Sequence, residues 1–299
     1  MVSKLLKRNS LGKKSLLNYM IDLTVIVPVK NEIEHISRCL TPIIGKVAQI
    51  IVVDSGSTDG TVEYCRSLEQ VELLNFNWNG EWPKKRQWVL NNYEIKGSWT
   101  LLLDADEVIS EPNLREINKA ISKNKIGAFW VPFDVYFGNR LLRYGDSRLY
   151  KMSLFRTGSS GYVRQVDDDS SNLDMEVHEH LQYNGSLEVD KLKLPVAHYS
   201  VHSLSRMILK YNDYSDWEVK KYYSNRSLNK QRHLTNQAKF RKMAKRNLIR
   251  LPGADRFYFY YLFIIRLGFI DGLNGYHRAK LQSQQIWMIQ AKIWERAFK

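Results

Sequence analysis

Residues 101–107 read Leu-Leu-Leu-Asp-Ala-Asp-Glu, an apolar run that ends directly in acidic side chains. Such a run is typical of a strand buried in a sheet. Because successive side chains of a strand point to opposite faces, Asp104 and Asp106 lie on the same side of the chain. Carboxylate oxygens suit a hard cation such as Mg²⁺ or Mn²⁺. An Asp-x-Asp pattern also occurs in solvated turns, so its meaning depends on the elements around it.

Upstream of this motif, apolar runs of strand length alternate with segments of helical spacing. The strands are expected at 22–28, 49–54, 71–75 and 99–104, and the helices at 33–44, from 60 to 68, from about Pro83 and from Glu111. This β-α-β-α order predicts an α/β fold with a mostly parallel sheet and helices on both of its faces.

Polar side chains follow three of the predicted strands. They are Lys30–Glu32 after the first, Asp54–Ser57 after the second and Asp104–Asp106 after the fourth. In sheets of this kind, ligands bind at the carboxyl ends of the strands. The convergence of these segments at one edge therefore favours a binding site over a solvated turn.

The chain is long enough for one large domain with an appendage, because it has 299 residues, of which 44% are hydrophobic. We expect a basic N-terminal extension at 1–20, the α/β domain at 21–200 and a basic, mostly helical region at 201–299. The two cysteines, Cys39 and Cys65, form no metal or disulfide pattern, which predicts a reducing, cytoplasmic setting. No apolar stretch reaches the roughly 18–20 residues of a membrane span.

The net charge of +14 is concentrated late in the chain, where residues 201–250 hold thirteen Lys and Arg against three acids. No nucleic-acid-binding signature accompanies this charge, so we expect no nucleic-acid partner. An anionic membrane surface or a phosphorylated substrate fits better. The following segment, 256–270, is RFYFYYLFIIRLGFI, which suits an interfacial helix. A helix buried against the α/β domain or a second subunit remains the alternative.

Taken together, VIVPVKNE, QIIVVDSGSTDGT and LLLDADE resemble the motifs of a family 2 glycosyltransferase with the GT-A (Rossmann-like) fold, over roughly residues 22–200. MEVHE at 175–179 and GFIDGLNG at 268–275 resemble the subgroup that builds lipopolysaccharide cores and other bacterial surface glycans. The resemblance implies an inverting transfer from a nucleotide-sugar, commonly a UDP-sugar, with Mg²⁺ or Mn²⁺. It also implies a glycan or lipid-linked acceptor, and with the charge it predicts a peripheral enzyme on the inner face of the cytoplasmic membrane.

The resemblance also implies roles for the residues at the sheet edge. Asp106 would hold the metal, and Asp104 would bind the ribose or assist the metal. Asp54, beside Ser55, would accept a hydrogen bond from the uracil ring, in a base pocket lined by Pro28, Lys30 and Glu32. In related enzymes a late histidine completes the metal shell, which makes His198 a candidate. Arg86 would attract the pyrophosphate, although a solvated helix face explains it almost as well.

An inverting displacement needs a base for the acceptor hydroxyl. Glu179 is the first candidate by resemblance, Glu176 the second, and Asp168 in an acidic loop the third. Two other classes stay open. A sugar nucleotidyltransferase would normally carry a glycine-rich phosphate loop after its first strand, where this chain has Pro-Val-Lys-Asn at 28–31. A non-catalytic module that binds anionic surfaces would have little use for acids at three strand ends.

Overall fold

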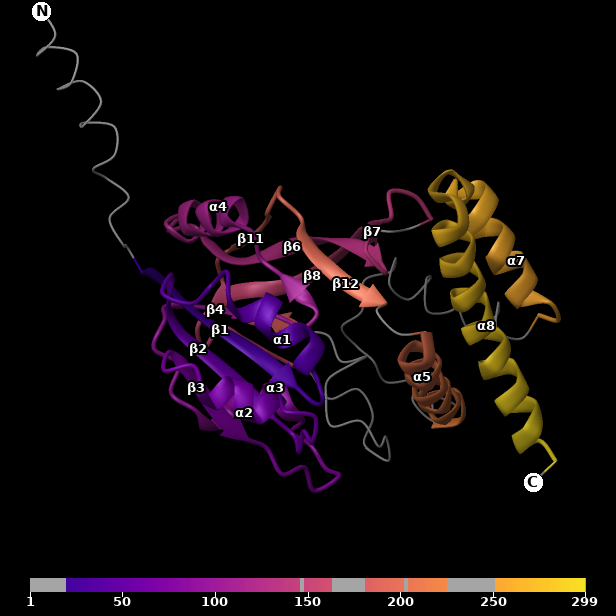
Figure 1. Cartoon of the computed structure of the whole chain (residues 1–299), viewed down its shortest axis with the longest axis horizontal. Helices are drawn as coiled ribbons and strands as arrows, with labels where there is room; N and C mark the ends of the chain where they lie inside the picture. Colours follow the sequence, from indigo (N-terminus) through magenta and orange to yellow (C-terminus); the bar gives the residue numbers. More distant parts are fainter. Residues whose placement is uncertain (1–19, 146–147, 163–180, 202–203, 225–250, 299) are drawn as a thin grey trace, which may run out of the picture.

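The computed structural model describes residues 20–145, 148–162, 181–201, 204–224 and 251–298 (Figure 1). Within these ranges most strands join one large sheet, in the order β3-β2-β1-β4-β8-β6-β12-β5, with β7 and β11 paired to β6. β9 and β10 form a separate pair. The strands are β1 (Ile21–Val29), β2 (Val47–Asp54), β3 (Val71–Asn75), β4 (Trp99–Leu102), β5 (Glu107–Val108), β6 (Ile126–Phe137), β7 (Arg140–Leu141), β8 (Arg148–Arg156), β9 (Ser160–Tyr162), β10 (Leu181–Tyr183), β11 (Glu188–Lys191) and β12 (Val196–Val201).

The first four strands run parallel, as the alternation of strands and helices predicts. β8 then enters between β4 and β6 and is antiparallel to both, whereas β12 is again parallel to β6. The short β5 runs antiparallel to β12. The α/β prediction is therefore confirmed, and the antiparallel insertion is an addition that the upstream pattern does not contain.

Helices cover both faces of the sheet. On one face, side chains such as Val25 and Val52 pack against α1 (Ile33–Leu40), α2 (Thr61–Arg66) and α4 (Glu111–Ile121). On the other face, Ile26 and Val53 pack against α3 (Lys85–Asn92). Burying one such aliphatic side chain contributes about 1.5–3 kcal/mol, so this two-sided core holds the sheet edge rigidly.

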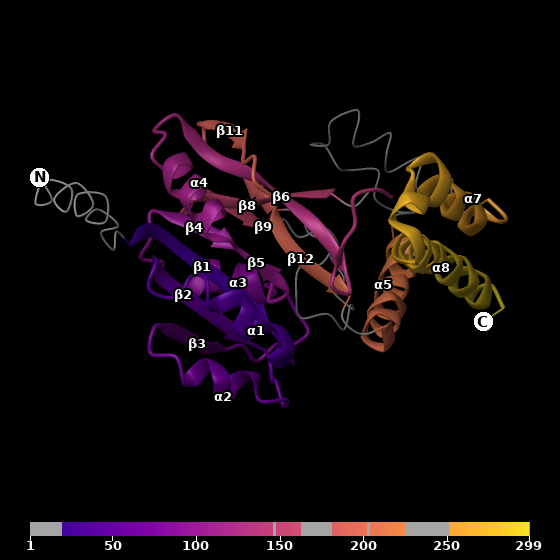
Figure 2. The ribbon, with the colours of Figure 1, turned by 45° about the horizontal axis from the view of Figure 1, so that its top comes forward.

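Further helices gather beyond the carboxyl ends of the parallel strands, as both views of the ribbon show (Figures 1 and 2). They are α5 (Leu204–Ser224), α7 (Ala254–Tyr260), the π-helical turn η1 (Tyr261–Ile265), the 3₁₀ turn η2 (Gly268–Asp271) and α8 (Gly272–Arg296). Small apolar clusters join α5 to α8, with Met207 and Tyr211 against Leu281 and with Val219 against Ile289. Throughout the described ranges, no helix combines the length and apolarity needed to cross a bilayer.

The GFIDGLNG segment attaches these helices to the sheet domain. The Asp271 carboxylate accepts hydrogen bonds from the backbone amides of Arg143 (3.1 Å) and Tyr144 (2.9 Å), just after β7. Within the segment, η2 and α8 come so close that a Cβ on Gly275 would lie 1.9 Å from the carbonyl oxygen of Gly268. Glycine is therefore required at 275 by backbone approach, and Asp271 by the amides it satisfies.

Candidate active site

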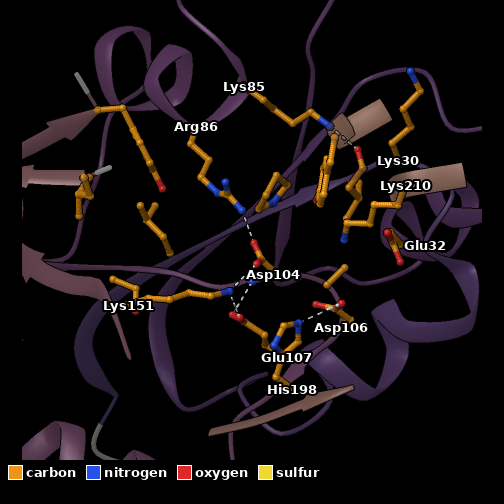
Figure 3. Close-up of a pocket in the computed structure, with 18 of the residues that line it drawn as sticks. Lys30, Glu32, Lys85, Arg86, Asp104, Asp106, Glu107, Lys151, His198 and Lys210 are labelled. Atoms are coloured by element: carbon orange, nitrogen blue, oxygen red, sulfur yellow. Dashed lines mark hydrogen bonds and ion pairs between the residues drawn. The ribbon is translucent and has the colours of Figure 1, made fainter. Parts of the chain in front are cut away.

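A pocket of about 880 Å³ opens at the carboxyl ends of β1 and β4 (Figure 3). Its lining comes from the segments after these strands, from the start of α3, from β8 and β12, and from α5. The predicted residues that line it are Pro28, Lys30, Glu32, Arg86, Asp104, Asp106 and His198. The structure thus brings together most of the candidates that the sequence places at this edge.

Hydrogen bonds between two loops position the β1 side of the pocket. The amide of Asn31 donates to Ser57 Oγ (2.8 Å), and the amide of Thr58 donates back to Asn31 Oδ1 (2.8 Å). Asn31 adopts a left-handed backbone conformation (φ 57°) to make this turn. The first amide of α1, that of Ile33, donates to Asp59 Oδ2 (3.1 Å) from the neighbouring loop. Glu32 is consequently held at the pocket by cross-loop contacts.

Asp54 and Ser55 are not among the residues that line the pocket. The Asp54 carboxylate is buried and accepts hydrogen bonds from the amides of Gly56 (2.8 Å) and Ser57 (3.1 Å) and from the Ser57 hydroxyl. This is the ordinary way in which an aspartate stabilises a turn. The contact between Asp54 and the uracil ring therefore stays a prediction.

Asp104 is held by two cations. Arg86 Nη2 forms an ion pair with one carboxylate oxygen, and Lys151 Nζ lies 2.9 Å from the other. Lys151 also pairs with the buried Glu107, whose second oxygen accepts from the Asp104 amide (2.9 Å). Burial alone would raise the pKa of Asp104, but the charges of Lys151 and Arg86 outweigh it and hold that pKa well below its usual range. Asp104 is thus an anion fixed in place.

Asp106 has a different neighbour. In the β12–β5 pairing, His198 lies opposite Glu107, and its Nε2 approaches Asp106 Oδ2 to 3.4 Å. Burial opposes the charge of Asp106, but the interaction with His198 is stronger and lowers the pKa of the carboxyl. Both side chains line the pocket, so a carboxylate and an imidazole face the same space (Figure 3).

The residues present fit a divalent cation at Asp106 and His198, since oxygen and imidazole nitrogen are ligands that Mn²⁺ accepts. Asp104 fits this role less well because both of its oxygens are already paired with cations. Among the described residues, no three His, Cys, Asp or Glu side chains are grouped to hold a metal. An ion bound here would therefore take most of its ligands from donor phosphates and water, as Mg²⁺ usually does.

Glu32 is the carboxylate of the pocket whose proton affinity rises most clearly. Burial, and then the negative charge of Asp106, raise its pKa to about 7, against the smaller opposing effects of Lys210 and Arg206. A carboxyl that titrates near neutrality inside a pocket is a common property of functional sites.

The three candidate bases, Glu179, Glu176 and Asp168, lie outside the described residues. Several pocket residues were given no role from the sequence, namely Lys85, Glu107, Lys151 and Lys210. Lys85 Nζ is buried and donates to the Val29 carbonyl (2.8 Å), which ties α3 to the end of β1. The signal for Lys151 is a lysine inside an apolar strand, RLYKMSLFR at 148–156, but its partners depend on long-range strand pairing.

The chain is similar to several known proteins. An "Uncharacterized glycosyltransferase" of Rickettsia felis is 22% identical over 94% of this chain and 92% of its own length. The dolichyl-phosphate beta-glucosyltransferase of Saccharomyces cerevisiae is 32% identical over 34% of this chain and 35% of its own. The structure of S. aureus TarS 1–349 in complex with UDP is 14% identical, covers 93% of this chain and 92% of its own, and gives a TM-score of 0.42.

The match to a family description is more extensive. The family described as Glycosyl transferase family 2 matches residues 24–185, more than half of the 299 residues. The matched range runs from within β1 to the end of β10 and therefore includes the strand ends that carry Glu32, Asp104 and Asp106. The sheet order, the pocket at its carboxyl edge and this match lead to one conclusion: the chain belongs to glycosyl transferase family 2 and is a glycosyltransferase.

Proposed function

We propose that this glycosyltransferase moves a sugar, with inversion, from a UDP-sugar to a hydroxyl of a glycan or lipid-linked acceptor in bacterial surface glycan synthesis. The observation that supports the proposal most directly is the pairing of Asp106 with His198 in a pocket that also contains several cations. A nucleoside diphosphate carries the charge that such a pocket would bind. A divalent ion at Asp106 and His198 would act as a Lewis acid toward the diphosphate.

In this proposal the side chains of the pocket bind and orient the donor. Asp104, kept ionised by Arg86 and Lys151, would accept hydrogen bonds from the ribose hydroxyls. Pro28, Lys30 and Glu32 would line the pocket for the uracil ring. Asp54, with Ser55, would contribute to this pocket through the turn that Asp54 stabilises. Because these groups are fixed by the core and by cross-loop hydrogen bonds, they need little rearrangement when the donor binds.

The acceptor hydroxyl must lose its proton as it attacks the sugar carbon opposite the leaving group. We propose Glu179 as the base, with Glu176 and then Asp168 as alternatives. Replacing Glu179 by Gln should lower turnover far more than donor binding. An unchanged turnover would transfer the role to one of the other two acids.

We also propose that the C-terminal helices, the expected region 201–299, lie on an anionic membrane surface. Exposed apolar side chains gather on α7, η1, η2 and the start of α8, and the most exposed are Phe257 (68%), Ile265 (70%) and Leu273 (76%). Arg256, Arg266 and Lys280 are exposed in the same segment. An apolar surface with neighbouring cations is what an interfacial segment presents to anionic lipid.

The reaction can be tested with a panel of UDP-, GDP- and CMP-sugars, incubated with the protein, a bacterial membrane extract and Mn²⁺. The expected result is release of one nucleotide together with labelled sugar in the extract, and loss of both in EDTA. Release of pyrophosphate from UTP would instead indicate a sugar nucleotidyltransferase. No release from any donor would contradict the proposed reaction.

A further inference from the structure

Beyond the family match at 24–185, one helix adds side chains to the pocket. Helix α5 contributes Arg206, Lys210, Asp213 and Tyr214 to its lining. The side chain of Lys210 extends into the pocket on the side of Glu32 and Asp106 (Figure 3). Lys30, by contrast, points its nitrogen away from the acidic side chains (Figure 3). A cation from the C-terminal helices is therefore directed toward the acids at the sheet edge.

Four other cations that line the pocket have partners in the protein. Arg86 and Lys151 pair with Asp104, Lys85 donates to the Val29 carbonyl, and Arg206 lies 3.7 Å from Glu34. Among the described residues, Tyr214 lies beside Lys210, whose Nζ is 5.8 Å from the centre of the Tyr214 ring. Burial opposes the charge of Lys210, but the Tyr214 side chain and the carboxylates of Asp106 and Asp104 raise its pKa above the usual value.

The packing of α5 on α8 fixes the position of Lys210. Met207, one turn before it, and Tyr211, next to it, are buried against Leu281. Further along α5, Lys292 of α8 reaches the side chains of Asn212 (2.8 Å) and Asp216 (2.7 Å). α8 is in turn tied to the sheet domain through Asp271. Lys210 therefore reaches the pocket from a helix that is held in place by its packing on α8.

From this geometry we infer that Lys210 contacts the diphosphate of the donor and stabilises the charge of the departing nucleoside diphosphate; this inference rests on the proposed function. In the transfer, the bond between the sugar carbon and the diphosphate oxygen breaks, and its electron pair stays on that oxygen. The acceptor oxygen forms the new bond to carbon and passes its proton to the base. Lys210 keeps its own proton throughout and acts through its charge.

The test compares binding of UDP and of uridine to the full chain by calorimetry in Mn²⁺, for the wild type, Lys210→Met and Lys210→Arg. The methionine keeps the length of the side chain and removes its charge. We expect Lys210→Met to weaken UDP binding about 10- to 100-fold, as for loss of a charged hydrogen bond, and to leave uridine binding unchanged. Lys210→Arg should recover most of the affinity. Turnover should fall at least as far as UDP affinity in Lys210→Met.

Lys220→Met is the matched control, because Lys220 is on the same helix but does not line the pocket. It should bind UDP as the wild type does. Equal weakening of UDP and uridine in Lys210→Met, or no weakening of either, would overturn the inference. If the Met variant fails to fold, an Arg variant with wild-type melting and no UDP affinity would overturn it as well. Failure of the wild type to bind any nucleoside diphosphate would instead count against the proposed function.

Discussion

The sheet domain and the C-terminal helices differ in how far their apolar side chains are buried. In the sheet, Val25, Ile26 and Val27 are completely buried between helices on the two faces. In the C-terminal helices the buried clusters are small, and Phe257, Ile265 and Leu273 are each more than two-thirds exposed. The sheet domain therefore buries its apolar side chains beneath its own helices. The described C-terminal helices leave an apolar surface exposed, as is typical of surfaces that contact a membrane or another protein.

The largest expected effect on activity is at the polar edge of the sheet domain. Asp106→Ala should reduce transfer by about 1,000-fold or more, equivalent to roughly 4 kcal/mol, because a charge that stabilises the leaving group is lost. Its melting temperature should stay close to that of the wild type, since Asp106 lies outside the apolar core. Transfer is measured by release of nucleotide from the donor that the panel identifies.

The control for this variant is Asp255→Ala, which removes a carboxylate from the start of α7, far along the chain from the pocket. It should keep full activity. Full activity of Asp106→Ala, or of the wild type in EDTA, would remove the metal role from this edge.

The next effect concerns stability and compares one leucine from each region. Leu101→Ala should lower the free energy of unfolding by about 2–5 kcal/mol, because Leu101 is 1% exposed and its loss leaves a cavity. Leu273→Ala should change it by less than about 0.5 kcal/mol, as is usual for surface positions. Chemical denaturation followed by circular dichroism measures both. An equal loss in Leu273→Ala would show that this surface is covered in solution.

A smaller effect is expected in lipid binding. Leu273→Ser should weaken binding to phosphatidylglycerol vesicles about tenfold, since one apolar side chain contributes roughly 1–2 kcal/mol on transfer from water. Leu194→Ser is the matched control, because Leu194 is 40% exposed but belongs to the sheet domain. Vesicle flotation gives the bound fraction. If both variants bind alike and sedimentation shows a dimer, a second copy covers the surface instead.

The two regions also differ in how far their structure follows from the sequence. Strands β1 to β4 and the acids that follow them could be predicted, because uninterrupted apolar runs and strand ends are local patterns. The ion pairs that those acids form could not be predicted. Asp104 is paired with Lys151 only because β8 inserts antiparallel between β4 and β6, a contact 47 residues apart in the chain. Lys210 likewise reaches the pocket through the packing of α5 on α8. Such contacts depend on tertiary structure and leave no local periodicity.

The smallest expected effect distinguishes two acids of the same edge. Asp104 is held ionised by cations, whereas the pKa of Glu32 is about 7 because burial and the charge of Asp106 oppose its ionisation. In the unfolded chain a glutamate titrates near 4.3. Between these pKa values the folded chain holds a proton that the unfolded chain has released, so stability should fall as pH rises from about 4.5 to 7.

Glu32→Gln should remove this part of the pH dependence, on the order of 1 kcal/mol, when unfolding is measured in EDTA at pH 5 and pH 7.5. Glu34→Gln is the control, since Glu34 lies two residues away and its side chain is 58% exposed. An identical pH dependence in the wild type and in Glu32→Gln would mean that Glu32 is ionised throughout this range. The two acids would then be held at this edge in the same charge state, and the carboxylates of the pocket would differ only in their partners.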